Sequence, residues 1–154
     1  MTVMFSDEHT RPVDGDALVA LARDVIRSEG YPASTEVSIR TVTDDVITDL
    51  KRTWFSVDAP TDVLSFPIDD LTPGRVPESD PDGPPVLLGD IVLAPDFIGR
   101  QARELGVAES DELALMVVHG MLHLMGWDHD SDDEAERMEA RERQILADIG
   151  VERR

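Results

Sequence analysis

The spacing of apolar residues predicts five helices along the chain. Over residues 16–29, leucine, alanine, valine and isoleucine recur three and four positions apart on one helix face, and Gly30 follows as a C-terminal cap. Thr43 can cap a second helix that continues to about Trp54. A proline at a first helical position, acidic residues before an apolar run, and a capping box indicate three further helix starts. These lie at Pro95, Ser110 and Ser131.

Four short segments have the composition of β-strands. They are residues 2–5, 35–42, 62–66 and 86–93. The second alternates apolar and polar positions until its end, and the fourth is interrupted at Gly89-Asp90. Strands interspersed with helices, and helices at the end, predict an α+β fold. We expect a single domain over residues 1–154, with a small mixed sheet of about four strands packed against helices.

Residues 69–85 have no apolar period and no helix signal. Prolines, glycines and acidic side chains fill this segment. Long connections of this composition run over the surface and tolerate change, and some of them carry function. We therefore predict a flexible acidic loop.

Composition and charge narrow the classes of function. The chain has 154 residues and no cysteine, which excludes disulfides and thiolate ligands and suits a cytoplasmic protein. No apolar stretch approaches the roughly 18 residues of a membrane span, and the start shows no secretory signal. The net charge of −19 argues against broad electrostatic binding to nucleic acid, and no DNA ligand is expected. The alternative is a local basic patch, for which Arg40, Lys51, Arg52, Arg100 and Arg103 are the candidates.

Three histidines follow an almost wholly apolar helix. Positions four apart share a helix face, so His119 and His123 can bind one ligand. Gly126 can adopt the positive φ that ends the helix, after which His129 can reach the same point. Three imidazoles with one open position are typical of catalytic zinc, and unpaired imidazoles at the end of this buried central helix would be costly. We predict one zinc ion per chain rather than ordinary polar side chains at a helix end.

Gly120 distinguishes the spacing of the three histidines from the signature of a zinc protease. The spacing matches the extended zinc-protease signature, which requires glutamate directly after the first histidine as general base. Glycine occupies that position here and cannot take a proton from metal-bound water, so a protease of this type is disfavoured. Glycine in a helix costs about 1 kcal/mol relative to alanine, which indicates close approach of substrate or backbone, or packing against another element. The fourth histidine, His9, is expected to be exposed and to take no part.

The segment His119-Gly-Met-Leu-His-Leu-Met-Gly-Trp-Asp-His129 resembles the YbeY family of bacterial endoribonucleases, whose pattern is H-G-x-L-H-L-x-G-[YW]-D-H. Two more segments match, Pro60-Thr-Asp-Val-Leu-Ser-Phe-Pro67 and Leu88-Gly-Asp-Ile91, the latter followed by Pro95 and Gln101-Ala102. The resemblance covers roughly residues 35–149. It implies a zinc-dependent endoribonuclease acting on single-stranded RNA in ribosomal RNA maturation and ribosome quality control. The three histidines would be its metal ligands, and the ribosome or ribosomal proteins its partners.

The chain departs from the family at one position. The family commonly has an arginine five residues before the proline of the Pro-Thr-Asp-Val segment, where it is thought to meet substrate phosphate. Phe55 occupies this position here. Arg52 is close enough in sequence to substitute for it.

The mechanistic hypothesis is metal-assisted cleavage of a phosphodiester. Zinc would activate water by lowering its pKa towards about 7, or would only stabilise charge while the 2′-hydroxyl of the RNA attacks. Asp128 either orients an imidazole or caps the turn, and Ser65 either lines the cleft or bonds to backbone. A second hypothesis is a ribosome-assembly factor with a mainly structural metal that docks on a basic partner protein. A third is a different hydrolase using the same site.

Overall fold

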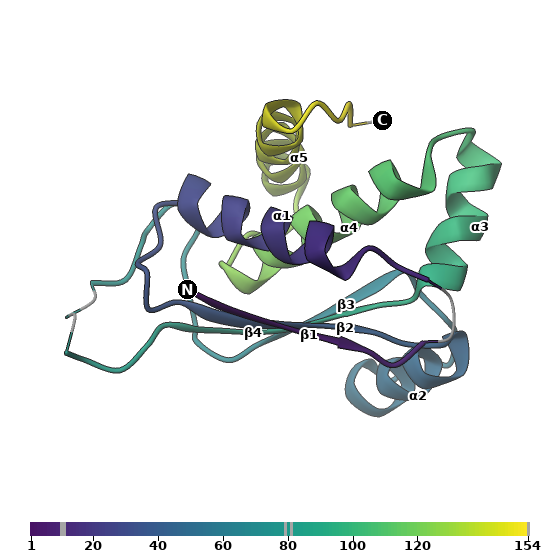
Figure 1. Ribbon diagram of the computed structural model, residues 1–154, viewed down its shortest axis with the longest axis horizontal. Coiled ribbons are helices and arrows are strands. Elements are labelled where there is room, and N and C mark those ends of the chain that lie inside the picture. The colour runs from purple at the N-terminus through teal and green to yellow at the C-terminus, as the bar shows by residue number, and fades with distance from the viewer. Residues whose placement is uncertain (10–11, 79, 81, 154) are drawn as a thin grey trace.

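A four-stranded sheet with helices on both faces organises the chain (Figure 1). The computed structural model describes residues 1–9, 12–78, 80 and 82–153. The strands are β1 Thr2–Asp7, β2 Glu36–Thr41, β3 Val63–Pro67 and β4 Leu87–Leu93. The helices are α1 Gly15–Ser28, α2 Asp44–Phe55, α3 Pro95–Leu105, α4 Glu109–Leu124 and α5 Asp132–Asp148. Each predicted helix and strand is present, with small shifts at its ends.

The sheet is mixed and has the strand order β1-β2-β4-β3. Strands β1, β2 and β4 are parallel to one another, and β3 pairs antiparallel with β4 at one edge of the sheet. The prediction that β4 is interrupted at Gly89-Asp90 is wrong, because the strand is continuous there. Instead, the register with β2 shifts, and Gly89 adopts a φ of 128° against the carbonyl oxygen of Phe66. A mixed sheet packed against helices confirms the α+β prediction.

Helix α4 is the central helix of the domain. Figure 1 shows α1 and α4 on one face of the sheet, with α5 beyond them, and α2 on the other face. All residues from Glu112 to Val118 are buried, as the apolar run predicts. In the C-terminal half of α4, only His119 and His123 are partly exposed. No helix in the described part of the chain, α4 included, is both long and apolar enough to cross a membrane.

Helix α2 covers the opposite face of the sheet. Ile47 is its one buried residue, and it packs with Val42, Leu64 and Val92. The last turn of the helix extends beyond this small core. Its aromatic side chains are therefore left on the surface.

Residues 69–85 are anchored at their first residue. The Asp69 N–H donates to the carbonyl of Leu87 at 3.2 Å, and its carboxylate accepts from the Leu87 N–H at 3.0 Å. The described part of this segment forms no helix or strand beyond a bridge between Thr72 and Arg75. Positions 79 and 81 lie outside the described residues, and the flexibility of the loop stays a prediction.

The prediction that His9 is exposed is wrong. Its side chain is 3% exposed, and its Nε2 lies 3.0 Å from Oδ2 of Asp96 in the first turn of α3. The partner is 87 positions away, so only the tertiary fold brings the two together. His9 lies outside the histidine cluster of α4.

Candidate metal centre

Helix α4 ends in a Schellman turn, which directs the following residues back towards the last turn of the helix. Gly126 has a φ of 95°, and its N–H donates to the carbonyl of His123 at 3.0 Å. The N–H of Trp127 donates to the carbonyl of Leu122 at 2.9 Å. A Cβ atom at position 126 would lie 2.1 Å from the carbonyl oxygen of Leu71. Glycine is therefore required here by both the dihedral angle and the contact, and the predicted turn is confirmed.

The turn brings three imidazoles together. The Nε2 atoms of His119 and His123 lie 3.0 Å apart. The ring centroid of His129 lies 5.6 Å from that of His119 and 4.9 Å from that of His123. One ring nitrogen of each histidine lies within 4.8 Å of the other two. His129 is exposed, so the cluster opens to solvent on its side.

This set of donors fits one divalent ion. A tetrahedral zinc ion with Zn–N distances of about 2.0–2.1 Å holds its nitrogen ligands about 3.3 Å apart, close to the separation of the first two Nε2 atoms. Among the described residues the cluster contains three side chains of metal-ligand type. Imidazole suits zinc and its neighbours in the first transition row, and three ligands leave one coordination position open.

The Nδ1 atoms of two histidines are already engaged. Nδ1 of His119 lies 3.2 Å from Oε1 of Glu142, whose side chain is 1% exposed. Nδ1 of His123 lies 3.0 Å from the carbonyl oxygen of Trp127. Such contacts fix the tautomer and the ring orientation, and they leave Nε2 for the ion.

Glu142 is a residue that the sequence reasoning missed. It lies on α5 between the buried Met138 and Ile145, so a charged residue interrupts the apolar stripe of that helix. A buried carboxylate requires partners, and this interruption is the signal that could have revealed it. Besides His119, its partner is Arg153, whose Nε lies 3.2 Å from Oε2.

Burial and pairing act on the pKa of Glu142 in opposite directions. Burial raises it, but the hydrogen bond with His119 and the positive charge of Arg153 together outweigh burial, so the pKa lies below its usual value. The carboxylate is therefore ionised at neutral pH. Burial lowers the pKa of His123 to about 4, and the charges of His119 and His129 act in the same direction. Its imidazole is therefore neutral at pH 7, which is the form that binds metals.

Gly120 faces the sheet and not the opening. A Cβ atom there would lie 3.1 Å from Cγ2 of Ile91 and 3.3 Å from Oγ of Ser65. Of the two explanations for this glycine, packing against another element is the one observed. The Ser65 hydroxyl donates to the Gly120 carbonyl at 3.2 Å, so it bonds to backbone as the simpler hypothesis states. Ser65 also lines the cleft in front of the histidines.

The histidines lie in a cleft of about 610 Å³. One side is formed by residues 61–65 and Pro67, leading into and along the edge strand β3. The other side is formed by Asp70 and Leu71 and by residues 126–129. Helix α2 contributes Lys51 and Phe55 to the lining of the cleft. The cleft is large enough to admit a substrate group beside the open position of the ion.

Asp128 caps the turn. Its Oδ1 accepts from the backbone N–H of His129 at 2.8 Å, and this hydrogen bond lowers the pKa of the carboxyl group. The imidazole-orienting role considered for Asp128 is performed for His119 by Glu142. Asp128 nevertheless lines the cleft, close to the exposed ligand His129.

Arg52 does not reach the cleft. Its guanidinium is held on the surface by Asp58, at 2.6 Å from Nη2, and by Asp49, at 2.8 Å from Nη1. These contacts raise its pKa, chiefly through the hydrogen bond to Asp58. Lys51, its neighbour on α2, lines the cleft instead. Adjacent positions on a helix point about 100° apart, which explains the difference.

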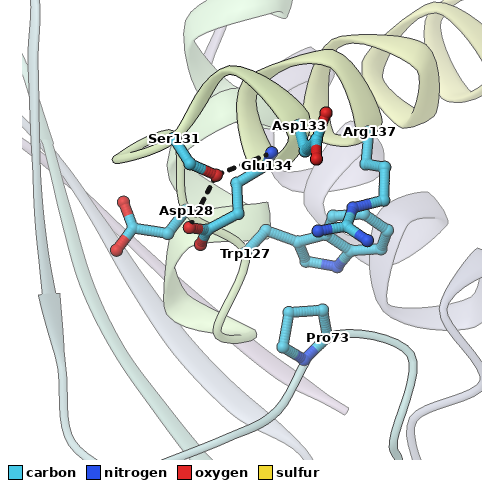
Figure 2. A pocket seen from close by; sticks show the side chains of 7 residues that line it. All are labelled: Pro73, Trp127, Asp128, Ser131, Asp133, Glu134 and Arg137. Carbon is cyan, nitrogen blue, oxygen red and sulfur yellow. Dashed lines mark hydrogen bonds between the residues drawn. The ribbon is translucent and has the colours of Figure 1, made fainter.

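A second hollow of about 530 Å³ adjoins the turn and the start of α5 (Figure 2). It shares Trp127 and Asp128 with the histidine cleft. At its rim, the Ser131 hydroxyl accepts from the Glu134 N–H at 3.2 Å and donates to the Glu134 carboxylate at 3.0 Å. Ser131 therefore caps α5 as predicted, which fixes where the helix that carries Glu142 begins.

Comparison with known proteins shows the family to which the chain belongs. A family model described as "Endoribonuclease YbeY" matches residues 4–150. Endoribonuclease YbeY of Mycolicibacterium gilvum is 41% identical over 146 residues, covering 95% of this chain and 82% of that protein. Endoribonuclease YbeY of Acidothermus cellulolyticus is 41% identical over 155 residues, covering 100% of this chain and 94% of that protein.

A solved structure has the same fold. The solution structure of TM1509 from Thermotoga maritima aligns with a TM-score of 0.57 at 24% identity, covering 96% of this chain and 91% of that one. The structural likeness shows the fold, and the sequence matches over nearly the whole length show the family. The chain belongs to the endoribonuclease YbeY family.

Proposed function

We propose that this protein is a zinc-dependent endoribonuclease that cleaves single-stranded RNA. The observation that carries the proposal is the convergence of His119, His123 and His129 at the floor of an open cleft. Family relatives of similar length are named as endoribonucleases, which supports the reaction class. The proposed setting is ribosomal RNA maturation and ribosome quality control in the cytoplasm, with the ribosome or ribosomal proteins as partners.

In this proposal, the side chains of the cleft have different roles. The three imidazoles would hold the ion through their Nε2 atoms, with Glu142 and the Trp127 carbonyl fixing two of the rings. When bound, zinc would supply a Lewis acid for a phosphoryl oxygen and would activate water or the ribose 2′-hydroxyl. Lys51, in the lining of the cleft, would meet a substrate phosphate in place of the arginine that the family commonly has near this position.

Two further residues of the cleft are proposed to contact the substrate. Asp128 presents an ionised carboxylate beside His129, where it could accept a proton from the attacking hydroxyl group. Ser65 lies across the cleft and would bound the space available to the ribose. Arg52 has no part in this proposal, because its guanidinium pairs with Asp49 and Asp58.

The net charge of −19 favours a second candidate, a ribosome-assembly factor that docks on a basic ribosomal protein and uses the metal mainly for stability. Structural zinc usually has four protein ligands, whereas this cluster has three and opens to solvent. The arrangement therefore favours catalysis.

Cleavage of a labelled single-stranded RNA by zinc-loaded protein tests the proposal. We expect cleavage that a chelator abolishes and that added zinc restores. His123→Ala should lose cleavage while its far-ultraviolet circular dichroism stays that of the wild type. His9→Ala is the matched control, because His9 lies outside the cluster, and it should keep activity. Unfolding of His123→Ala, or no cleavage by the zinc-loaded wild type, would support the structural alternative.

A further inference from the structure

Three aromatic side chains gather on the surface beside the histidine cleft. Trp54 and Phe55 end helix α2 and are 67% and 48% exposed. The ring centroid of Phe66 of β3 lies 6.3 Å from that of Trp54 and 5.8 Å from that of Phe55. We call these three residues the aromatic cluster. Phe66 is partly buried and packs against the small core under α2, whereas Trp54 and Phe55 are exposed beside it. Large apolar side chains that stay exposed next to one another indicate a binding surface.

The aromatic cluster lines a hollow that adjoins the histidine cleft at the edge strand β3. The cluster lines a hollow of about 530 Å³. Phe55, Ser65 and Pro67 line both this hollow and the cleft that holds the histidines. A single strand bound in the cleft can therefore extend past Phe55 and the edge of β3 to the aromatic rings.

Electrostatics limits what can hold RNA here. The chain has a net charge of −19, so contacts with phosphates cannot supply most of the affinity. The arginines nearest the aromatic cluster are paired, Arg52 with Asp49 and Asp58, and Arg40 with Glu8 at 2.6 Å. Stacking on aromatic rings needs no net positive charge, because each base presents a π face.

We propose that the aromatic cluster binds unpaired nucleobases by stacking, directly beside the metal centre. The proposal rests on the proposed function and deepens it, because it names how substrate is held and why it must be single-stranded. Bases within a duplex are already stacked on their neighbours and cannot lie on Trp54 or Phe66. Phe55, which lines both hollows, then contacts a base next to the histidine cleft.

Equilibrium binding to the zinc-loaded full chain tests this proposal. The probe is a fluorescein-labelled, fully 2′-O-methylated single strand of about ten nucleotides, a length within the range of known single-strand sites. Gel analysis verifies that the probe stays intact during the measurement. The variants are Trp54→Ala, Trp54→Phe and Trp54→Leu. Leu105→Ala is the matched control, because Leu105 is 46% exposed at the end of α3 and outside both hollows.

We expect Trp54→Ala to weaken binding about tenfold or more, Trp54→Phe to restore most of the loss, and Leu105→Ala to change nothing. Trp54→Leu should bind as weakly as Trp54→Ala, since leucine is apolar but has no π face. The salt dependence of wild-type binding should correspond to only about one or two phosphates. The duplex form of the same probe should bind far more weakly.

The outcomes separate this proposal from the function on which it rests. Wild-type binding retained by Trp54→Ala overturns the stacking site but leaves the metal-dependent cleavage assay and its His123→Ala control unaffected. Wild-type affinity in Trp54→Leu overturns the stacking site too, because the contact would then need only an apolar side chain and no π face. Docking of a basic protein segment would then explain the exposed aromatic residues. Failure of the wild type to bind any single strand contradicts both the proposed function and the stacking site.

Discussion

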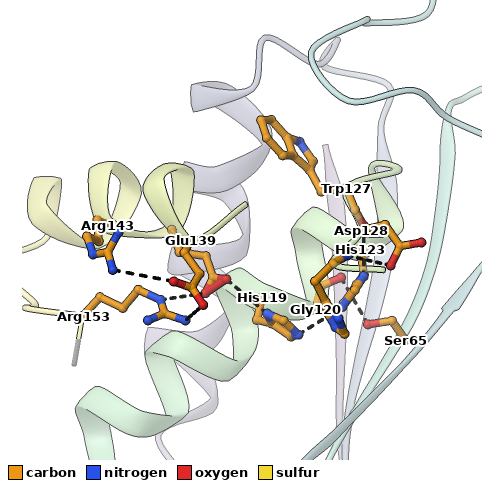
Figure 3. Close-up of polar contacts among 11 residues, drawn as sticks. Ser65, His119, Gly120, His123, Trp127, Asp128, Glu139, Arg143 and Arg153 are labelled. Atoms are coloured by element: carbon orange, nitrogen blue, oxygen red, sulfur yellow. Dashed lines mark hydrogen bonds and ion pairs between the residues drawn. The ribbon is translucent and has the colours of Figure 1, made fainter. Parts of the chain in front are cut away.

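Oε1 of Glu142 lies 3.2 Å from Nδ1 of His119, although the two residues belong to different helices and are 23 positions apart. The carboxylate is 1% exposed, whereas the imidazole is 24% exposed. The orientation of this proposed metal ligand therefore depends on a residue outside the histidine motif. Figure 3 shows Glu139 and Arg153 on one side of His119 and the cleft residues Ser65 and Asp128 on the other.

Glu142→Gln should weaken zinc binding by about 10- to 100-fold, because glutamine keeps the shape of the side chain but loses the charge that orients and polarises the ring. Competition with a chromophoric chelator measures the zinc Kd. Glu139→Gln is the control, since Glu139 is 45% exposed and pairs only at 3.7 Å with Arg143 and Arg153. Equal zinc affinity in wild type and Glu142→Gln would show that this contact does not support the ligand.

Zinc should stabilise the folded protein in proportion to its affinity. At a free zinc concentration of 100 times Kd, the free energy of unfolding should rise by about 2.7 kcal/mol, because the folded state alone presents the three nitrogens together. Urea denaturation with and without zinc measures this difference. His129→Ala should lose most of the gain but little stability without zinc, because His129 is exposed. A gain that persists in His129→Ala would place the ion elsewhere.

Gly126→Ala should destabilise the protein by about 3 kcal/mol or more. The new Cβ would lie 2.1 Å from the Leu71 carbonyl oxygen, in addition to the cost of the positive φ. The variant Gly106→Ala separates the cost of the positive φ from the cost of the steric contact. Gly106 ends α3 with a φ of 68° and has nothing within 4 Å of its would-be Cβ, so only about 1 kcal/mol is expected. Chemical denaturation measures both, and similar losses would contradict the role assigned to the Leu71 contact.

Tyr31 should titrate near pH 12 in the folded protein. Burial raises its pKa to about 12, and the charge of Glu29 adds to the effect. A group whose folded pKa is raised contributes stability below its unfolded pKa of about 10 and loses it as pH rises towards 12, at about 1.4 kcal/mol per pH unit. The chain has one tyrosine, so phenolate absorbance reports this residue alone. Tyr31→Phe should lose less stability over this pH range, and a midpoint near 10 in the folded protein would contradict the expectation.

The histidine centre could be predicted because its determinants are local. Helical spacing unites His119 and His123, and the conformational freedom of Gly126 returns His129, so no knowledge of the sheet is needed. The burial of α4 could be predicted in the same way, because its apolar run is not confined to one face of the helix.

The rest depended on contacts that sequence spacing does not encode. Glu142 and His9 each meet a partner from another element, and only the tertiary fold brings these pairs together. Arg52 was the expected substitute for the family's arginine, but the rotation of α2 about its axis places Lys51 at the cleft instead. Ile47 and Leu50 fix this rotation by packing against the sheet. Nearness in sequence to the family's arginine position was a poor guide, because neighbouring helix positions face different directions.

The two hydrogen bonds between Asp69 and Leu87 make the intervening segment a suitable place for inserted sequence. Its ends are already joined by backbone and side-chain hydrogen bonds, so doubling its length would cost only about 0.6 kcal/mol in loop-closure entropy. Insertions beyond Arg75 should therefore leave the three histidines in place. Changes near Leu71 would instead press on Gly126 and tilt the turn that positions His129. A tag or a fused module thus belongs after the Thr72–Arg75 bridge and not before it.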